Sequence, residues 1–375
     1  MMKILIDMTH ITMSKIHAST SIYIFRILDT LYKNNKSHVL LIHTDLKDYV
    51  KNKYPGVDYI IFPHTSDHVQ RRKKGLSKFI FQAIQYRKYA KLSQCDGILI
   101  ANDLHLYTCI PTSLKKIVVI HDLKALKDNS IIGKIIYYIF YFILILSSFK
   151  TIAISNFTKQ DILKHFGNFL DKKIEVVYNS IQLSCKSTRP LSIPIKLQYI
   201  LHINTLLEYK NIKTLIEAMS ITPNINHKLI VVGKATSYWN NSVIPFIKKK
   251  NLTNKIIHLP NVTDEELRYL YENASLFVSC STREGFGYTP IEAAICKCPV
   301  ISSTCEALPE TTHNMLTYYS PVYDAKELNI KMIEILSNPP TLSQLKKISD
   351  FFSNLYTPEK QTTKIFSLFY DSNTE

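Results

Sequence analysis

The stretch that decides the interpretation of this chain is Glu284-Gly285-Phe286-Gly287-Tyr288-Thr289-Pro290-Ile291-Glu292. Two carboxylates, eight positions apart, flank a Gly-Phe-Gly turn in a chain that has only 8 glycines among 375 residues. On the composition of ordinary proteins and this low glycine content, a Gly-x-Gly pair is expected by chance about 0.2 times per chain. The pair therefore predicts a backbone that needs positive φ here or that approaches a ligand closely.

The residues around this stretch predict a strand, a loop and a helix in succession. Residues 276–279 form an apolar run, residues 281–288 form the loop, and Pro290 is expected at the start of the helix. A helix N-terminus that faces a ligand favours phosphate groups. Carboxylates accept hydrogen bonds from hydroxyl groups, such as the vicinal hydroxyls of a sugar. The stretch therefore predicts a nucleotide-sugar site, because such a ligand has phosphates, a ribose diol and a sugar.

Short apolar runs alternate with helical patterns along the chain, which is typical of parallel βαβ units. A segment without periodicity, residues 179–194, separates two such series. We predict an α/β fold of two Rossmann-like domains with parallel sheets that face a cleft, with ligands at the carboxyl ends of the strands. The expected strands are 3–7, 38–43, 59–62, 97–101, 116–120, 151–154, 199–203, 228–232, 255–258, 276–278 and 299–302. The expected helices include 21–33, 77–92, 211–219, 264–273 and 290–296.

The stretch from Glu284 to Glu292 resembles the E-x7-E motif of retaining GT-B glycosyltransferases of the family 4 type, or glycosyl transferases group 1. Mannosyltransferases and rhamnosyltransferases are of this type. The resemblance implies an acceptor domain over residues 1–180, a donor domain over 190–355, and a C-terminal helix near 356–375 that crosses back to the first domain. Segments that share the resemblance are 119–123, 154–159, 199–206, 210–218, 228–233, 259–267, 299–303 and 308–310.

The resemblance implies a role for each candidate residue. Glu284 is expected to contact hydroxyls of the donor sugar, Lys210 to neutralise the diphosphate leaving group, and His121 to lie beside the transferred sugar. Glu292 is expected to hold the ribose diol. The remaining donor-binding positions are Gly285, Phe286 and Gly287 along the sugar, Tyr288 and Thr289 at the phosphates, Asn261 and Val262 at the base, and Thr205.

The chain departs from the family pattern at three places. Tyr209 stands where the family often has arginine, and Asn204-Thr205 stands where it often has Gly-Arg or Gly-Thr. Residues 19–21 lack the glycines of the family's N-terminal loop. These departures leave Lys210 as the expected phosphate-binding cation of the site.

The resemblance implies transfer of a sugar from a nucleoside diphosphate donor to a hydroxyl of a glycan or lipid-linked saccharide, with retention and without a metal or other cofactor. Three alternatives are a nucleotide-sugar epimerase or hydrolase, a degenerate nucleotide-sugar-binding subunit, and a DNA glycosyltransferase of the phage type. The last would also explain the formal net charge of +16, which favours anionic partners.

Two segments raise the question of a membrane. Residues 71–91 are basic with interleaved aromatics, which predicts either a solvated helix or a contact with an anionic membrane surface; no nucleic-acid-binding module accompanies them. The apolar run 135–146 is too short to span a bilayer. We expect a buried helix there, with membrane contact as the alternative.

Seven cysteines without a disulfide framework, and an N-terminus without a signal-peptide pattern, indicate a cytoplasmic protein, peripheral at most to the inner face of the membrane.

Overall fold

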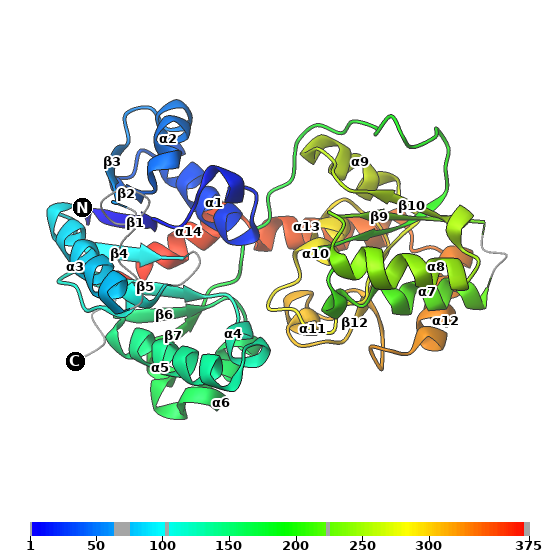
Figure 1. Cartoon of the computed structure of the whole chain (residues 1–375). Helices are drawn as coiled ribbons and strands as arrows, with labels where there is room; N and C mark the ends of the chain where they lie inside the picture. Colours follow the sequence, from blue (N-terminus) through cyan, green and yellow to red (C-terminus); the bar gives the residue numbers. More distant parts are fainter. Residues whose placement is uncertain (1, 64–75, 102–104, 223–225, 371–375) are drawn as a thin grey trace. The chain divides into compact units, whose positions relative to one another are not determined.

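The computed structural model describes residues 2–63, 76–101, 105–222 and 226–370. The chain divides into two compact units, one formed by Met1–Ser180 with Pro358–Glu375 and the other by Ile181–Thr357 (Figure 1). Arg71 to Lys74, the most basic part of the segment 71–91, lies outside the described residues.

The described part of the first unit contains a parallel seven-stranded sheet in the order β3-β2-β1-β4-β5-β6-β7. The strands are β1 Ile4–Met8, β2 His38–Ile42, β3 Asp58–Ile61, β4 Gly97–Ile100, β5 Lys115–Ile120, β6 Lys150–Ala153 and β7 Ile174–Val176. The helices are α1 Ser19–Lys33, α2 Lys47–Lys53, α3 Leu76–Leu92, α4 Lys124–Asp128, α5 Ile131–Ser147, α6 Asn156–Phe166 and α14 Pro358–Ser367.

The described part of the second unit contains a parallel six-stranded sheet in the order β10-β9-β8-β11-β12-β13. The strands are β8 Tyr199–Ile203, β9 Lys228–Val232, β10 Ile256–Leu259, β11 Leu276–Ser279, β12 Val300–Ser303 and β13 Thr317–Tyr319. The helices are α7 Ile212–Ile221, α8 Ile244–Lys249, α9 Asp264–Asn273, α10 Tyr288–Ile295, α11 Leu308–Thr311, α12 Ala325–Ser337 and α13 Leu342–Leu355.

The predicted fold class is confirmed: both units are α/β with a parallel sheet. Burial explains why the strands were visible in the sequence, because parallel strands covered on both faces are continuously apolar. β1 and β2, for example, are buried at every position. β7 and β13 were not predicted, because they have only three residues each and show no apolar run.

The C-terminal helix α14 belongs to the first unit and lies against α1 (Figure 1). Gln361 on α14 accepts a hydrogen bond from Oγ of Ser180 at 2.7 Å, and both side chains are buried. The buried ring of Phe369 packs so closely on Gly97 that a Cβ at that glycine would lie 2.6 Å from it. These contacts fasten the end of the chain to the first sheet.

The apolar run 135–146 forms most of α5, but the expectation of a buried helix is wrong for its outer face. Only Phe140, Tyr141, Leu144 and Ile145 are buried on this helix. Its other side leaves a row of isoleucines exposed, among them Ile131 at 78% and Ile132 at 72%. In the part of the chain that the structure describes, no helix is both long enough and apolar enough to cross a membrane.

Candidate functional site

The candidate site lies where the strand order of the second sheet reverses. β8 and β11 are neighbours in the sheet, and the chain proceeds from β8 to one side and from β11 to the other. The loops that follow these two strands must diverge at their carboxyl ends, and open α/β sheets bind ligands at such a point. Lys210 follows β8 and Glu284 follows β11, so the fold brings these two predicted residues together.

Lys210 and Glu284 form a largely buried ion pair. Nζ of Lys210 donates to Oε1 of Glu284 at 2.5 Å, and the two side chains are 11% and 14% exposed. The backbone of Asn211 turns the chain here with a left-handed φ of 52°, and its side-chain Nδ2 donates to the carbonyl of Val322 at 2.9 Å. This anchor starts α7 and fixes the lysine beside the acid.

Glu284 is also held by two residues that the sequence analysis did not identify. Oγ of Ser281 donates to the same Oε1 at 2.8 Å, and Oε2 of Glu306 accepts from the backbone N–H of Glu284 at 2.8 Å. In the sequence, Ser281 lies three residues before Glu284, and this spacing could have indicated the contact. Glu306 belongs to the loop after β12, and only the fold places it here.

Two cations lie close to Tyr209, which stands where the family often has arginine. The Nζ of Lys210 and the guanidinium carbon of Arg283 each lie 5.0 Å from the centroid of the Tyr209 ring. The backbone N–H of Thr282 donates to the Tyr209 carbonyl at 2.8 Å, which ties the two loops together. The expectation of Lys210 as the lone cation therefore missed Arg283, which lies one residue before Glu284 in the sequence.

Glu292 lies in the middle of α10, and its side chain is half-buried. Its Oε2 accepts a hydrogen bond from the hydroxyl of Tyr271 at 3.0 Å. Tyr271 is a fully buried residue of α9, and burial together with the Glu292 carboxylate raises the pKa of its hydroxyl, so the tyrosine stays a donor. A buried tyrosine on a neighbouring helix therefore orients Glu292, a partner that sequence spacing did not reveal.

The Gly-Phe-Gly turn starts α10 with a left-handed residue, as its glycines suggested. Gly287 has a φ of 87°, and a Cβ there would lie 2.3 Å from Cδ2 of Leu308. The helix begins at Tyr288, two residues earlier than predicted, so Pro290 lies third in the helix rather than first. This position is still tolerated because the N–H groups of a first turn have no partners within the helix.

The remaining donor-binding candidates lie around the same sheet edge. Gly285 and Phe286 follow Glu284, and the Phe286 side chain is buried against Tyr356, with 5.2 Å between the ring centroids. Phe286 can therefore offer a ligand its backbone only. Tyr288 and Thr289 form the first turn of α10. Thr205 follows β8 and is exposed, while Asn261 and Val262 follow β10 just before the capping box of Thr263 and Glu266.

His121 lies in the first unit, directly after β5, and its Nε2 is 2.9 Å from the carbonyl oxygen of Ala101. Its ring meets the ring of Tyr23 edge-on, with 4.9 Å between their centroids. His121 therefore belongs to the first unit, whereas Lys210, Glu284 and Glu292 belong to the second.

The strand order of the first sheet also reverses, between β1 and β4, and a polar cluster lies there. The imidazole of His10 after β1 hydrogen-bonds the hydroxyl of Tyr107, which lies 3.2 Å from Oγ1 of Thr9. Thr9 and Tyr86 then donate to the buried carboxyl of Asp7, each at 2.7 Å. Burial raises the pKa of Asp7, and the hydrogen bonds act in the opposite direction. The sequence analysis did not identify this cluster.

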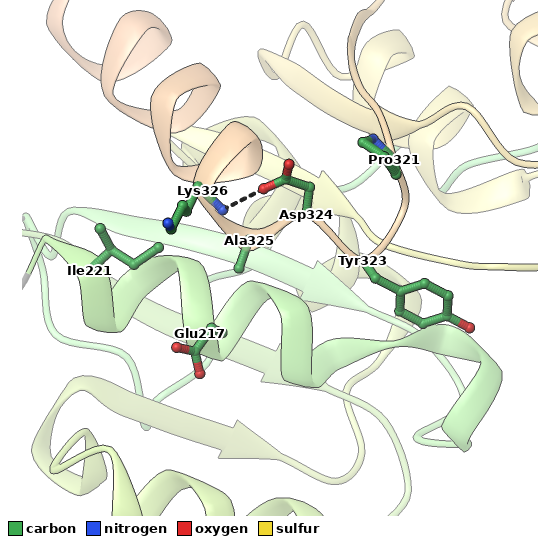
Figure 2. A pocket seen from close by; sticks show the side chains of 7 residues that line it. All are labelled: Glu217, Ile221, Pro321, Tyr323, Asp324, Ala325 and Lys326. Carbon is green, nitrogen blue, oxygen red and sulfur yellow. Dashed lines mark hydrogen bonds between the residues drawn. The ribbon is translucent and has the colours of Figure 1, made fainter.

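A pocket of about 520 Å³ lies at the start of α12 in the second unit, and Figure 2 draws the side chains that line it. None of the candidate residues lines it. Oδ1 of Asp324 accepts from the backbone N–H of Lys326 at 2.9 Å and so already caps this helix. The residues lining it are Glu217, Ile221, Pro321, Tyr323, Asp324, Ala325 and Lys326. The pocket is therefore distinct from the residues at the reversal point.

Comparisons with known proteins bear on the family and the fold. Residues 186–350 match the family model described as "Glycosyl transferases group 1". The "O-antigen chain mannosyltransferase RfbU" of Salmonella typhimurium is 28% identical over 213 residues, which make up 56% of this chain. The match covers 58% of that relative, so only part of its length is represented.

Two solved structures share the fold over nearly the whole chain. A glycosyltransferase from Rickettsia africae superposes with a TM-score of 0.76 at 19% identity, covering 100% of this chain and 99% of that one. Anabaena Alr3699/HepE in complex with UDP and glucose has a TM-score of 0.74 at 16% identity, covering 99% of this chain and 100% of that one. The family match over residues 186–350 and the shared fold support a GT-B glycosyltransferase, whereas the family 4 type and the roles assigned to the E-x7-E motif stay predictions.

Proposed function

We propose that this protein transfers a sugar from a nucleoside diphosphate donor to a hydroxyl of a bacterial surface glycan or its lipid-linked precursor. The proposal rests on one observation. Lys210 and Glu284 form an ion pair where the strand order of the second sheet reverses, and Glu292 lies on the helix that follows. The mannosyltransferase name of the Salmonella relative favours mannose as the transferred sugar, and the UDP complex of the Anabaena protein supports a nucleotide on this fold.

The charges of the site suit a departing diphosphate. Lys210 is already held in place by Glu284, so little side-chain order is lost when phosphate oxygens arrive. The guanidinium carbon of Arg283 lies 5.0 Å from the centroid of the Tyr209 ring and supplies a second cation. We propose that these two cations stabilise the negative charge that grows on the leaving group, which makes a metal ion unnecessary.

Glu284 and Glu292 would recognise hydroxyl groups. A carboxylate accepts hydrogen bonds strongly, and each of these acids already has a fixed orientation through Ser281 or Tyr271. Glu292 would hold the ribose diol, and Glu284 the sugar next to the phosphate. The first turn of α10 would supply backbone N–H groups to the phosphates.

We propose that transfer proceeds with retention by attack on the face from which the phosphate leaves. The bond between the anomeric carbon and the phosphate oxygen breaks, and the acceptor oxygen bonds to the same face of that carbon. The acceptor proton passes to the departing phosphate. His10, which hydrogen-bonds the hydroxyl of Tyr107 beside the buried Asp7 and Thr9, would bind an acceptor hydroxyl on the first unit, and His121 would lie beside the transferred sugar. The thiols of this chain suit the cytoplasm.

The test is a transfer assay with a panel of labelled nucleoside diphosphate sugars, with and without lipid-linked acceptors, in the presence of a chelator. We expect label in the acceptor with one donor, no effect of the chelator, and retained configuration in the product by NMR. Release of free sugar at the same rate without acceptor would indicate a hydrolase instead.

A further inference from the structure

The outer face of α5 is an apolar surface that the described first unit leaves largely exposed. Its exposed side chains recur at helical spacing and include no charged group. They are Ile131, Ile132, Ile135, Ile136, Tyr138, Ile139, Ile143 and Leu146, each between 43% and 78% exposed. We call these eight residues the α5 face. Monomeric soluble proteins rarely leave a contiguous apolar patch of this kind in water, and such patches mark protein or membrane contacts.

The inner side of α5 fixes this helix to the sheet. Phe140, Tyr141, Leu144 and Ile145 are buried in the core of the first unit, and Ser130 caps the helix start. The α5 face therefore belongs to a firmly packed helix that lies along the surface, as Figure 1 shows. It cannot be buried by a rotation of the helix without emptying the core.

Positive charge surrounds the α5 face. Lys134 lies exposed in the first turn of the helix, and Nζ of Lys173 donates to the carbonyl of Leu146 at its end, at 2.6 Å. The hydroxyl of Tyr138 donates to the carbonyl of His165 at 3.1 Å, which places the last turn of α6, with its exposed Lys164, beside α5. Residues 122–175 contain eight lysines against four aspartates and one glutamate.

The helix α3 extends this surface. Both α3 and α5 pack on the short 3-10 helix Leu106–Cys109 and contribute to one core cluster, so they cover the same face of the sheet. On its outer side α3 exposes Ile80 and Ile84, followed by exposed Arg87, Lys88 and Lys91. A second helix on this side thus combines apolar and basic side chains.

We propose that the α5 face docks this protein onto an anionic lipid bilayer, with its seven aliphatic side chains inserted among the acyl chains and the lysines at the headgroups. An in-plane helix with an apolar face and basic borders is suited to such a surface. A second copy of the chain is disfavoured as the occupant, because it would bring the same lysines, on a chain of net charge +16, against each other. The inference does not depend on the donor assignment.

The test uses the full chain and vesicles of phosphatidylcholine with about a third phosphatidylglycerol. The variant Ile132→Ser/Ile135→Ser/Ile139→Ser removes the centre of the α5 face. The matched control, Ile221→Ser/Ile330→Ser/Ile333→Ser, changes three isoleucines of the second unit that are also exposed, at 43%, 56% and 39%. We expect the wild type and the control to sediment with the vesicles and the α5 variant to bind at least about tenfold more weakly.

A second readout reports insertion directly. The chain has one tryptophan, Trp239, which is buried in the second unit and serves as the internal standard. Tryptophan fluorescence of the Ile139→Trp variant should be quenched by brominated lipids, whereas wild-type fluorescence should not. The proposal is overturned if the α5 variant binds vesicles like the wild type, or if the wild type is a dimer that this variant converts to a monomer. Unchanged melting temperatures of the variants exclude misfolding as the cause.

Discussion

The ammonium of Lys210 lies 2.5 Å from a carboxylate oxygen of Glu284, although 74 positions separate the two residues in the chain. Each residue follows one of the two central strands of the second sheet, so the topology brings them together. A largely buried ion pair needs further hydrogen bonds to offset its desolvation, and Oγ of Ser281 supplies one to the same carboxylate oxygen. A diphosphate that binds here would share the lysine with the acid and meet a cation that is already in position.

Replacing Lys210 with alanine should impair the chemical step more than donor binding. If Lys210 stabilises charge that develops on the leaving group, its loss lowers kcat by about two to three orders of magnitude. Lys213 is the matched control, because it lies on the following helix and its Nζ donates to Ser242. Lys213→Ala should keep kcat within about twofold. Equal losses in both variants would refute a specific role for Lys210. Steady-state kinetics with saturating acceptor measure both.

Arg283→Ala should weaken donor binding if this residue replaces the arginine expected at position 209. The guanidinium carbon lies 5.0 Å from the centroid of the Tyr209 ring, so an arginine side chain at position 209 would occupy nearly the same region as that of Arg283. We expect the donor KM to rise about tenfold or more in Arg283→Ala, and to recover in Arg283→Ala/Tyr209→Arg. A donor KM that stays at the wild-type value in the single variant contradicts this role.

Gly287→Ala should destabilise the second unit by about 2–4 kcal/mol, because it combines left-handed strain with a clash. The added Cβ would lie 2.3 Å from Cδ2 of Leu308, which is fully buried. Gly56 has almost the same φ, 86°, but open space around it. Gly56→Ala should therefore cost only about 1–2 kcal/mol.

Calorimetric unfolding of both variants measures the difference. In a double-mutant cycle, Leu308→Ala should relieve part of the cost of Gly287→Ala. Equal costs at Gly287 and Gly56, with no coupling to Leu308, would show that the helix start is not packed as described.

Acid should destabilise the second unit through His202. This fully buried histidine donates from Nδ1 to the carbonyl of Val278 in its neutral form, and burial lowers its pKa to about 4. The folded pKa lies below the unfolded value of about 6.5. The stabilisation is therefore complete above the unfolded pKa and is lost as the pH falls toward the folded pKa. Between about pH 7.5 and about pH 5 the loss is about 2 kcal/mol.

Urea unfolding followed by the fluorescence of Trp239, which lies in the second unit, can measure this loss. The variant His202→Gln should be less stable at neutral pH but should lack this part of the pH dependence. The same pH dependence in both proteins would contradict the assignment to His202.

The sequence was sufficient for features that depend on local pattern. Apolar runs located the longer strands, and the glycine pair located a left-handed turn at Gly287. The contacts made between elements were not predictable. Tyr271 behind Glu292, Glu306 behind the backbone of Glu284, and the cluster around Asp7 all join residues from different loops or helices. Nothing in their spacing marks such pairs.

The run 135–146 shows that hydrophobicity alone does not predict which side of a helix is buried. High hydrophobicity predicts burial on average, but a helix on one face of a sheet can bury only the side that meets the sheet. Phe140 and Leu144 fill that side, and Ile132 and Ile139 remain outside. The same composition fits a core helix and a surface helix, and only the packing distinguishes the two.

The central claim is a nucleoside diphosphate site that Glu292 completes through its hydrogen bond from Tyr271. Calorimetric titration of the wild type, Glu292→Ala and Tyr271→Phe with UDP, GDP and their sugars tests it most directly. Glu327→Ala is the control, since Glu327 is likewise a half-buried acid on a helix of the second unit.

We predict that one nucleotide binds the wild type and the control equally. Its binding to Glu292→Ala should be at least about tenfold weaker, as expected for a lost hydrogen bond to a charged group, with a smaller loss in Tyr271→Phe. No binding of any nucleotide to the wild type, or equal binding to Glu292→Ala, would contradict the account.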